Sequence, residues 1–236
     1  MAAAALLALL LVPAGFAGGE RALRTRSAAR LTSMTAVELT LEKVRDVTLM
    51  WVERAVVGLQ LCPFAEAPLR SGGIGVHMST ATDQEELLAD IDEQCARLLG
   101  QSKEQVATVL IAAPNLSLPF LEFQDGVATL EDEELFGETF PAYDERVMLV
   151  CFHPEAMWEG LSADDPLNYE KRAPWVVVNL LRTEMVDAAI LTGRTVDIGA
   201  KNEIRLREAG IDRVRAIYRD IFSAFRLVSE VAEGHS

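Results

Sequence analysis

Apolar residues follow two patterns along this chain, and the patterns alternate. Short, almost unbroken apolar runs are typical of buried strands, and they predict strands over residues 74–78, 106–112, 146–152 and 175–181. Apolar residues three and four positions apart are typical of amphipathic helices, and they predict helices over residues 41–59, 82–99, 117–136, 183–191, 201–209 and 211–231. Strands that alternate with helices indicate an α/β protein.

Local signals mark several of the predicted ends. Thr82 with Glu85 has the sequence of a capping box, and Gly210 is a natural cap between the last two helices. Residues 155–172 follow neither pattern and are expected to be irregular. We therefore expect residues 36–236 to form a single α/β sandwich domain, with a small, partly parallel sheet of about four strands flanked by helices.

The first 35 residues differ from the rest and predict a targeting leader. Residues 1–17 contain a short apolar stretch that suits a signal-peptide core but cannot span a bilayer. Residues 18–35 carry four Arg among Ser and Thr, a composition typical of transit peptides. This order resembles the bipartite leaders of algae with secondary plastids, with Phe16 at the first cleavage point. We therefore expect a plastid location; the mitochondrion and secretion are the alternatives.

The net charge of the chain bears on which kinds of molecule it can bind. The net charge is −14, and it becomes −17 without residues 1–35, which carry four Arg and one Glu. Such an acidic body repels phosphate backbones, which argues against nucleic-acid binding. After residue 35 no apolar segment approaches the ~18–20 residues of a membrane span, so we expect a mature protein that is soluble and does not enter a membrane.

The three cysteines are too few and too scattered for a zinc site or a disulfide framework. Cys95 and Cys151 fall on apolar stripes and are expected in the core. Cys62 follows a helix and precedes a proline. As a nucleophile it would need a partner such as His153 or an Arg, because the C-terminal end of a helix raises the pKa of a thiol. The alternative is a buried structural thiol.

His153 and Arg182 each follow an apolar strand, and ligand sites in α/β proteins form at such ends. If these two strands run parallel, both side chains emerge at one edge of the sheet. His153, fixed in extended backbone before Pro154, would be a general acid or base, or it would cap the strand. Arg182 precedes a helix and would bind an anion there, or it would pair with Glu184.

Polar residues before the fourth strand complete the candidate site. Arg172 would join Arg182 if the loop over residues 155–172 folds across the sheet. Asp164, Asp165 and Asn168 offer hard oxygen ligands for Mg²⁺, but the same residues before a proline are what a turn requires, and the turn is the favoured interpretation. No metal site is therefore predicted, and no cofactor is identified.

Several motifs, in order, resemble an uncharacterised bacterial family, domain-of-unknown-function family number 1415. The resemblance runs from Trp51 to about Gly210, and it rests on the segments Val57–Ala65, Phe152–Pro154, Asp165 with Asn168, Arg172–Pro174, Asn179–Arg182, and Ile198 with Asn202–Ile204. It implies that Cys62, His153, Asn168, Arg172 and Arg182 belong to one site. Asn179 and Thr183 depart from it, since the family usually has His and Glu there.

These observations lead to two hypotheses. In the first, the protein is a plastid enzyme that acts on a small anionic metabolite. His153 is its acid or base, Cys62 is a nucleophile or part of the wall, Arg172 and Arg182 hold the anion, and Asn168 and Asn179 orient it beside Asp165. In the second, the same pocket serves a non-catalytic ligand-binding or assembly factor.

Overall fold

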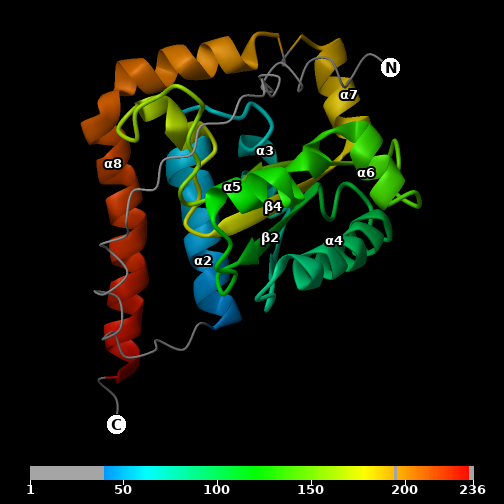
Figure 1. Ribbon diagram of the computed structural model, residues 1–236, viewed down its shortest axis with the longest axis horizontal. Coiled ribbons are helices and arrows are strands. Elements are labelled where there is room, and N and C mark those ends of the chain that lie inside the picture. The colour runs from blue at the N-terminus through cyan, green and yellow to red at the C-terminus, as the bar shows by residue number, and fades with distance from the viewer. Residues whose placement is uncertain (1–39, 194–195, 234–236) are drawn as a thin grey trace, which may run out of the picture.

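The computed structural model describes residues 40–193 and 196–233, and side chains as far as residue 223 (Figure 1). Four strands form one sheet in the order β1-β2-β4-β3. β1 (Ile74–Met78) runs parallel to β2 (Thr108–Ala113), whereas β4 (Val176–Arg182) lies antiparallel between β2 and β3 (Val147–Phe152). The prediction of a small, partly parallel sheet of about four strands is confirmed.

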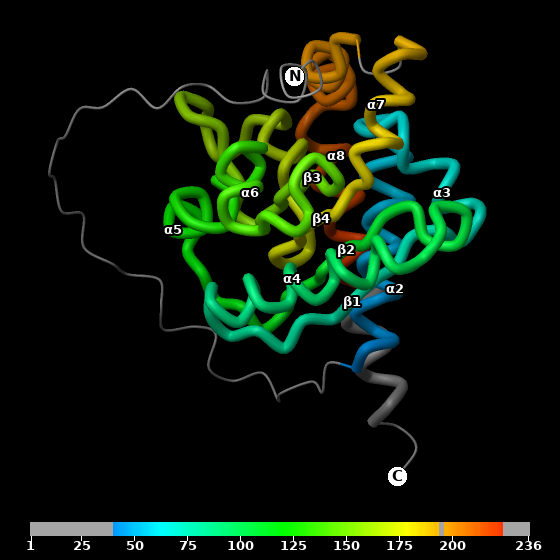
Figure 2. The backbone as a smooth tube through the Cα atoms, turned by 90° about the vertical axis from the view of Figure 1, so that its right-hand side faces the viewer, coloured from blue at the N-terminus to red at the C-terminus, as the bar shows by residue number. Residues whose placement is uncertain are grey.

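Helices cover both faces of this sheet (Figure 2). One layer contains α4 (Gln84–Leu99), α5 (Phe120–Asp125), the 3₁₀ helix η3 (Val127–Glu131) and α6 (Glu133–Thr139). The other contains α2 (Leu41–Trp51), the π-helix η2 (Val52–Val57) and α8 (Ile198–Glu233). Because successive side chains of a strand point to opposite faces, Val109 and Ile111 pack in the first layer and Leu110 and Ala112 in the second.

Three further elements lie around the second layer. They are α3 (Glu66–Ser71), the 3₁₀ helix η4 (Pro166–Glu170) and α7 (Thr183–Leu191), which begins directly where β4 ends. The α-helical part of the segment predicted over residues 41–59 ends at Trp51 and continues as the π-helix η2.

Two of the predicted helices differ from the observed ones. The start of α4 is capped by Asp83, whose carboxylate accepts a hydrogen bond from the N–H of Glu86, and the Glu86 carboxylate in turn accepts one from the N–H of Thr82. The capping box therefore lies one residue later than predicted. The helix predicted over residues 117–136 breaks at Gly126, so that α5 and α6 are separate.

The last two predicted helices meet at Gly210, as expected. Its φ of 74° and ψ of 156° are outside the range of a helix and are accessible essentially to glycine alone. In Figure 1 the chain crosses the top of the molecule as the first part of α8, turns at this residue and descends beside α2.

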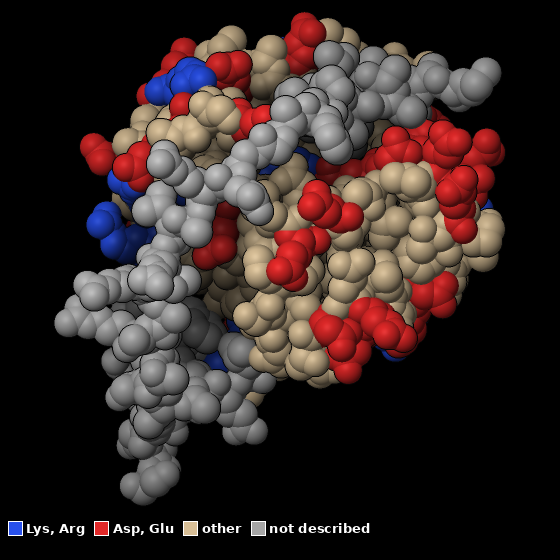
Figure 3. Space-filling model, in the orientation of Figure 1, with Lys and Arg blue, Asp and Glu red and all other residues tan. Residues whose placement is uncertain are grey.

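The surface agrees with the acidic composition. Asp and Glu side chains are spread over the face that Figure 3 shows, which includes α5 and α6. In the described part of the chain no helix is both long and apolar enough to cross a membrane.

Candidate functional site

The direction of the strands separates two residues that the sequence placed together. β3 and β4 are antiparallel, with Phe152 opposite Val177 and Val147 opposite Arg182. The parallel arrangement that would have brought His153 and Arg182 to one edge is therefore wrong, and the two residues lie at opposite ends of the sheet. The same pairing brings Arg172, which precedes β4, to the end of the sheet where His153 lies.

A cavity of about 470 Å³ lies between the sheet and the second helical layer. Leu110, Val150 and Asn179 belong to its floor, and its other walls come from η2, α3, α7, the start of α8 and the segments before β4. Most of its lining side chains are apolar. The polar ones include Cys62, Thr108, Glu170, Lys171, Arg172, Asn179, Arg182 and Asn202. An apolar cavity of this size with a few polar groups is typical of small-molecule sites.

Arg172 lines this cavity and is held there by neutral groups. Its Nε donates to the carbonyl of Ala156 at 2.9 Å, and one Nη donates to the carbonyl of Ala163 at 3.3 Å. The guanidinium also lies over the ring of Tyr169, 4.5 Å from its centroid. Among the described residues no carboxylate pairs with it. The loop over residues 155–172 thus orients Arg172 while leaving its charge uncompensated.

Its neighbour Lys171 has a different environment. The Lys171 ammonium lies 2.8 and 3.0 Å from the two carboxylate oxygens of Glu131, and both side chains are more than four-fifths buried. Glu131 also accepts a hydrogen bond at 2.5 Å from the N–H of Cys151, on the outer edge of β3. The charge of Lys171 is therefore already neutralised.

Asn179 lies in the middle of β4, opposite Leu110 on one side and Val150 on the other. Its Oδ1 lies 2.5 Å from the hydroxyl of Thr108, which is also 2.8 Å from the carbonyl of Leu180. Both Asn179 and Thr108 line the cavity, so they form a small polar area in an otherwise apolar floor.

Arg182 reaches the opposite end of the cavity, but its hydrogen bonds serve the fold. Its Nε donates to the carbonyl of Val106 at 3.1 Å, and Nη2 donates to the carbonyls of Leu98 and Gln101 at 2.6 and 2.7 Å. Leu98 and Gln101 lie at the end of α4, where free carbonyls and the helix dipole favour a cation. The partner of Arg182 is therefore a helix end; Glu184 pairs with Lys103 instead.

His153 is buried in the first layer, outside the cavity lining. Its ring lies against Phe120 and Phe123, with centroids 5.4 and 5.2 Å away. Nδ1 accepts a hydrogen bond from the N–H of Glu155 at 3.0 Å, so Nε2 carries the proton and donates to the carbonyl of Leu118 at 2.9 Å. Both ring nitrogens are thus engaged with the main chain, as the strand-capping alternative expected.

Cys62 lines the cavity from the segment between η2 and α3. Burial raises the pKa of its thiol, although hydrogen bonds from the N–H groups of Phe64 and Ala65 act in the opposite direction. A thiol with a raised pKa is protonated at neutral pH and is a poor nucleophile. The environment of Cys62 therefore suits a wall residue. Cys95 and Cys151 are buried in the core, as predicted.

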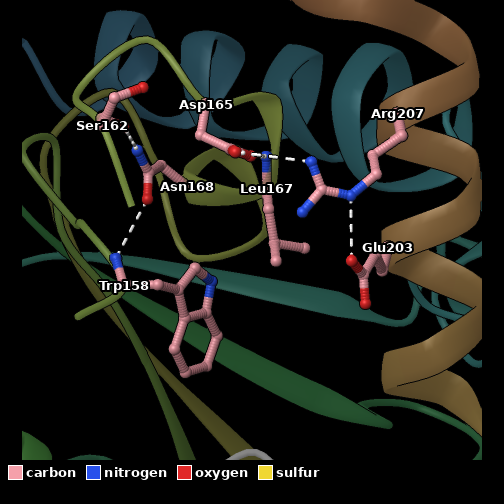
Figure 4. Close-up of polar contacts among 7 residues, drawn as sticks. All are labelled: Trp158, Ser162, Asp165, Leu167, Asn168, Glu203 and Arg207. Atoms are coloured by element: carbon pink, nitrogen blue, oxygen red, sulfur yellow. Dashed lines mark hydrogen bonds and ion pairs between the residues drawn. The ribbon is translucent and has the colours of Figure 1, made fainter. Parts of the chain in front are cut away.

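Asp165 and Asn168 organise the loop that carries Arg172 (Figure 4). Asp165 accepts a hydrogen bond from the N–H of Leu167 and lies 3.4 Å from Arg207 on α8. Asn168 is fully buried; it accepts from the N–H of Trp158 and donates to the carbonyl of Ser162. Neither lines the cavity. The turn interpretation is confirmed, and the described residues contain no group of three or more His, Cys, Asp or Glu that could hold a metal.

Four polar cavity residues were missed as site residues from the sequence: Thr108, Glu170, Lys171 and Asn202. Asn202, on α8, donates to the carbonyl of Leu61 at 2.9 Å and to Oε1 of Glu170 at 2.8 Å. Burial raises the pKa of the Glu170 carboxyl, and the hydrogen bond from Asn202 lowers it by a smaller amount. Asn202 lies in one of the resembling motifs, which was the available signal. Glu170 had none, because it looks like any acidic residue of a surface loop.

Comparison with known protein families identifies the family of this chain. A family described as proteins of unknown function (DUF1415) matches residues 43–216, which include every cavity-lining residue except Tyr218. The chain belongs to the DUF1415 family. No curated protein and no solved structure matches it.

Membership of the DUF1415 family confirms the resemblance but brings no reaction with it. The structure divides the candidate site residues into two groups. Cys62, Arg172, Asn179 and Arg182 line the cavity, whereas His153, Asp165 and Asn168 support the loop and the strand end beside it.

Proposed function

We propose that the protein binds a small molecule with a largely apolar body and one anionic group, a carboxylate or a phosphate, in the cavity between the sheet and helices α3, α7 and α8. The observation that carries this proposal is the environment of Arg172. Arg172 is one of the residues that line the cavity, and its guanidinium is fixed by two carbonyl groups and a tyrosine ring and has no carboxylate partner among the described residues.

An uncompensated guanidinium in an apolar wall is well suited to an anion. Attraction between charges is stronger there than in water, and the planar fork matches the geometry of a carboxylate or phosphate. Because Arg172 is already oriented, little side-chain entropy is lost when the ligand binds. The apolar floor around Leu110 and Val150 supplies the surface for the body of the ligand, and Asn179 with Thr108 offers it one polar contact.

A catalytic role for His153 is not part of this proposal, because its ring lies outside the cavity and both its nitrogens are engaged. Of the two hypotheses drawn from the sequence, the proposal therefore follows the ligand-binding one. It keeps from the enzyme hypothesis the anionic nature of the ligand.

The test is a thermal-shift screen of the full chain against octanoate, indole-3-propionate, phenyl phosphate and inorganic phosphate. Arg172→Gln is compared with Arg213→Gln, which removes the same charge from an exposed position of α8 outside the cavity. A ligand at a hundredfold excess over Kd stabilises by about 2.7 kcal/mol, which is readily measured.

We expect at least one organic anion to raise the melting temperature of the wild type and of Arg213→Gln, but not of Arg172→Gln. Inorganic phosphate, which lacks an apolar body, is expected to have a smaller effect. The proposal fails if no organic anion stabilises the wild type, or if Arg172→Gln responds as strongly as the control.

We also propose that residues 1–35, which lie outside the described residues, direct the protein to a plastid. The support is the apolar stretch followed by four Arg among Ser and Thr. A fluorescent protein fused to residues 1–35 should enter the plastid of an alga with a secondary plastid. Fluorescence in the mitochondrion or the medium would refute this.

A further inference from the structure

Glu170 also lines the cavity and, like Arg172 and Arg182, has no ionic partner among the described residues. It is the last residue of η4, and its Oε1 accepts a hydrogen bond from the buried Asn202. No hydrogen bond reaches its other oxygen from any described residue, and the side chain lines the cavity. One carboxylate oxygen is therefore left for a ligand.

The basic residues around Glu170 are occupied elsewhere. Lys171 is held by both oxygens of Glu131. Arg205, on the same helix as Asn202, donates to the carbonyl of Gln60 and to Asn202 itself. Glu203 is the nearby acidic residue, and it is paired with Arg207. Burial without an ionic partner accounts for the raised pKa of the Glu170 carboxyl.

Glu170 and Arg172 are two residues apart but face different partners. Glu170 contacts Asn202 on α8, whereas Arg172 contacts carbonyls of the loop over residues 155–172. No ion pair joins them. The cavity thus contains a negative and a positive group, each oriented by neutral hydrogen bonds, with apolar surface around both.

We propose that the ligand carries both charges, an amino group that binds Glu170 and a carboxylate that binds Arg172, on an apolar body: an amino acid or a close relative. This inference rests on the proposed function and adds the amino group. A ligand of this class satisfies both charges at once, whereas a simple carboxylate leaves Glu170 unpaired in an apolar wall.

The experiment compares two sets of three probes by titration calorimetry on the full chain. One set is L-leucine, 4-methylpentanoate, which lacks the amino group, and 3-methylbutylamine, which lacks the carboxylate. The other is L-tryptophan, indole-3-propionate and tryptamine. The variants are Glu170→Gln, which keeps the shape and the acceptor for Asn202, and Glu203→Gln, which removes a nearby carboxylate outside the cavity lining.

In at least one set we expect the amino acid to bind the wild type ten times more tightly than either analogue. The affinity of Glu170→Gln for the amino acid should fall about tenfold, to the affinity for the carboxylate analogue. The Kd of the carboxylate analogue itself should stay within twofold of its wild-type value. Glu203→Gln should behave as the wild type. Glu170→Asp, which keeps the charge on a shorter side chain, should retain part of the preference.

Three outcomes overturn the inference: neither amino acid binds, the carboxylate analogue binds as tightly as the amino acid, or Glu170→Gln keeps the full preference. The second and third leave an anion site at Arg172 intact. If neither amino acid binds, the anion screen with Arg172→Gln decides the proposed function separately.

Discussion

Replacing Arg182 by Met should lower the stability of the protein strongly, although Arg182 lines the cavity. The Arg182 side chain is buried and donates three hydrogen bonds to main-chain carbonyls, two of them at the end of α4. Methionine fills a similar volume but donates nothing. The variant therefore tests whether Arg182 holds α4 against the strands rather than binding a ligand.

The size of the effect follows from these contacts. Hydrogen bonds from a charged group contribute about 1.5–3 kcal/mol each, so three would contribute about 5–9 kcal/mol. Gln101 is exposed, so water replaces part of that interaction, and removing the charge also removes its desolvation cost. We expect a net loss of about 3 kcal/mol in the free energy of unfolding. For a domain of this size that lowers the melting temperature by about 6–12 °C.

Urea unfolding at pH 7, followed by circular dichroism and tryptophan fluorescence, measures this loss. The control is Lys103→Met, which removes the ion pair between Lys103 and Glu184. Both of these side chains are at least half exposed. Such a pair contributes about 1 kcal/mol or less. Because Arg182 is buried, its effect should be the same in 1 M salt, where exposed pairs are screened. A loss for Arg182→Met below about 1 kcal/mol, or one no larger than that of the control, would refute the structural role.

Four further predictions concern other parts of the fold. Gly210→Ala should cost about 1–3 kcal/mol in urea unfolding, because the backbone there has φ 74° and ψ 156°; a variant as stable as the wild type would contradict this. Tyr218→Phe should cost about 1–2 kcal/mol, since its buried hydroxyl donates to a carbonyl before β4 at 2.7 Å, and thermal unfolding would reveal it. A double-mutant cycle with Lys171→Met and Glu131→Gln should give a coupling of about 1 kcal/mol or more, because the pair is mostly buried; additive losses would argue against the pair. The Glu170 carboxyl has a higher pKa in the folded state than in the unfolded state, so the folded state binds the proton more tightly. The stability that this proton binding provides is present at low pH and is lost as the pH rises from about 4.5 through the raised pKa. Glu170→Gln should therefore gain stability relative to the wild type across that range, and an unchanged difference between pH 4 and pH 7.5 would contradict the shift.

The outline of the fold could be predicted because it depends on burial. Runs such as 147–152 and 176–181 are apolar because both faces of the sheet are covered, and Gly210 marks a bend because only glycine adopts its conformation. Strand direction leaves no such trace, since a strand buried on both faces has the same apolar composition whichever way it runs. The antiparallel β4 was therefore missed, and with it the separation of His153 from Arg182.

The candidate site was only partly predictable for a related reason. Arg172, Asn179, Arg182 and Cys62 line the cavity, but whether a polar side chain serves a ligand or a main-chain carbonyl depends on neighbours that are distant in the sequence. Arg182 meets the end of α4 more than eighty positions earlier, and His153 meets Leu118 thirty-five positions earlier. Glu170 became a site residue only when Asn202 of α8 placed it at the cavity.

The bend at Gly210 also determines when the protein can finish folding. It returns the chain beside α2, so that Tyr218, near the C-terminus, contacts the indole N–H of Trp51 at 3.2 Å, and Val214 and Ile221 enter the same core as Val44 and Val47. During synthesis the ribosome releases α2 and the whole sheet before this last helix. The apolar side of α2 therefore lacks its cover until the part of α8 after Gly210 has been synthesised. A chain cut short near residue 210 would keep all four strands and still expose the apolar side of α2, so the part of α8 after Gly210 is needed to close this core.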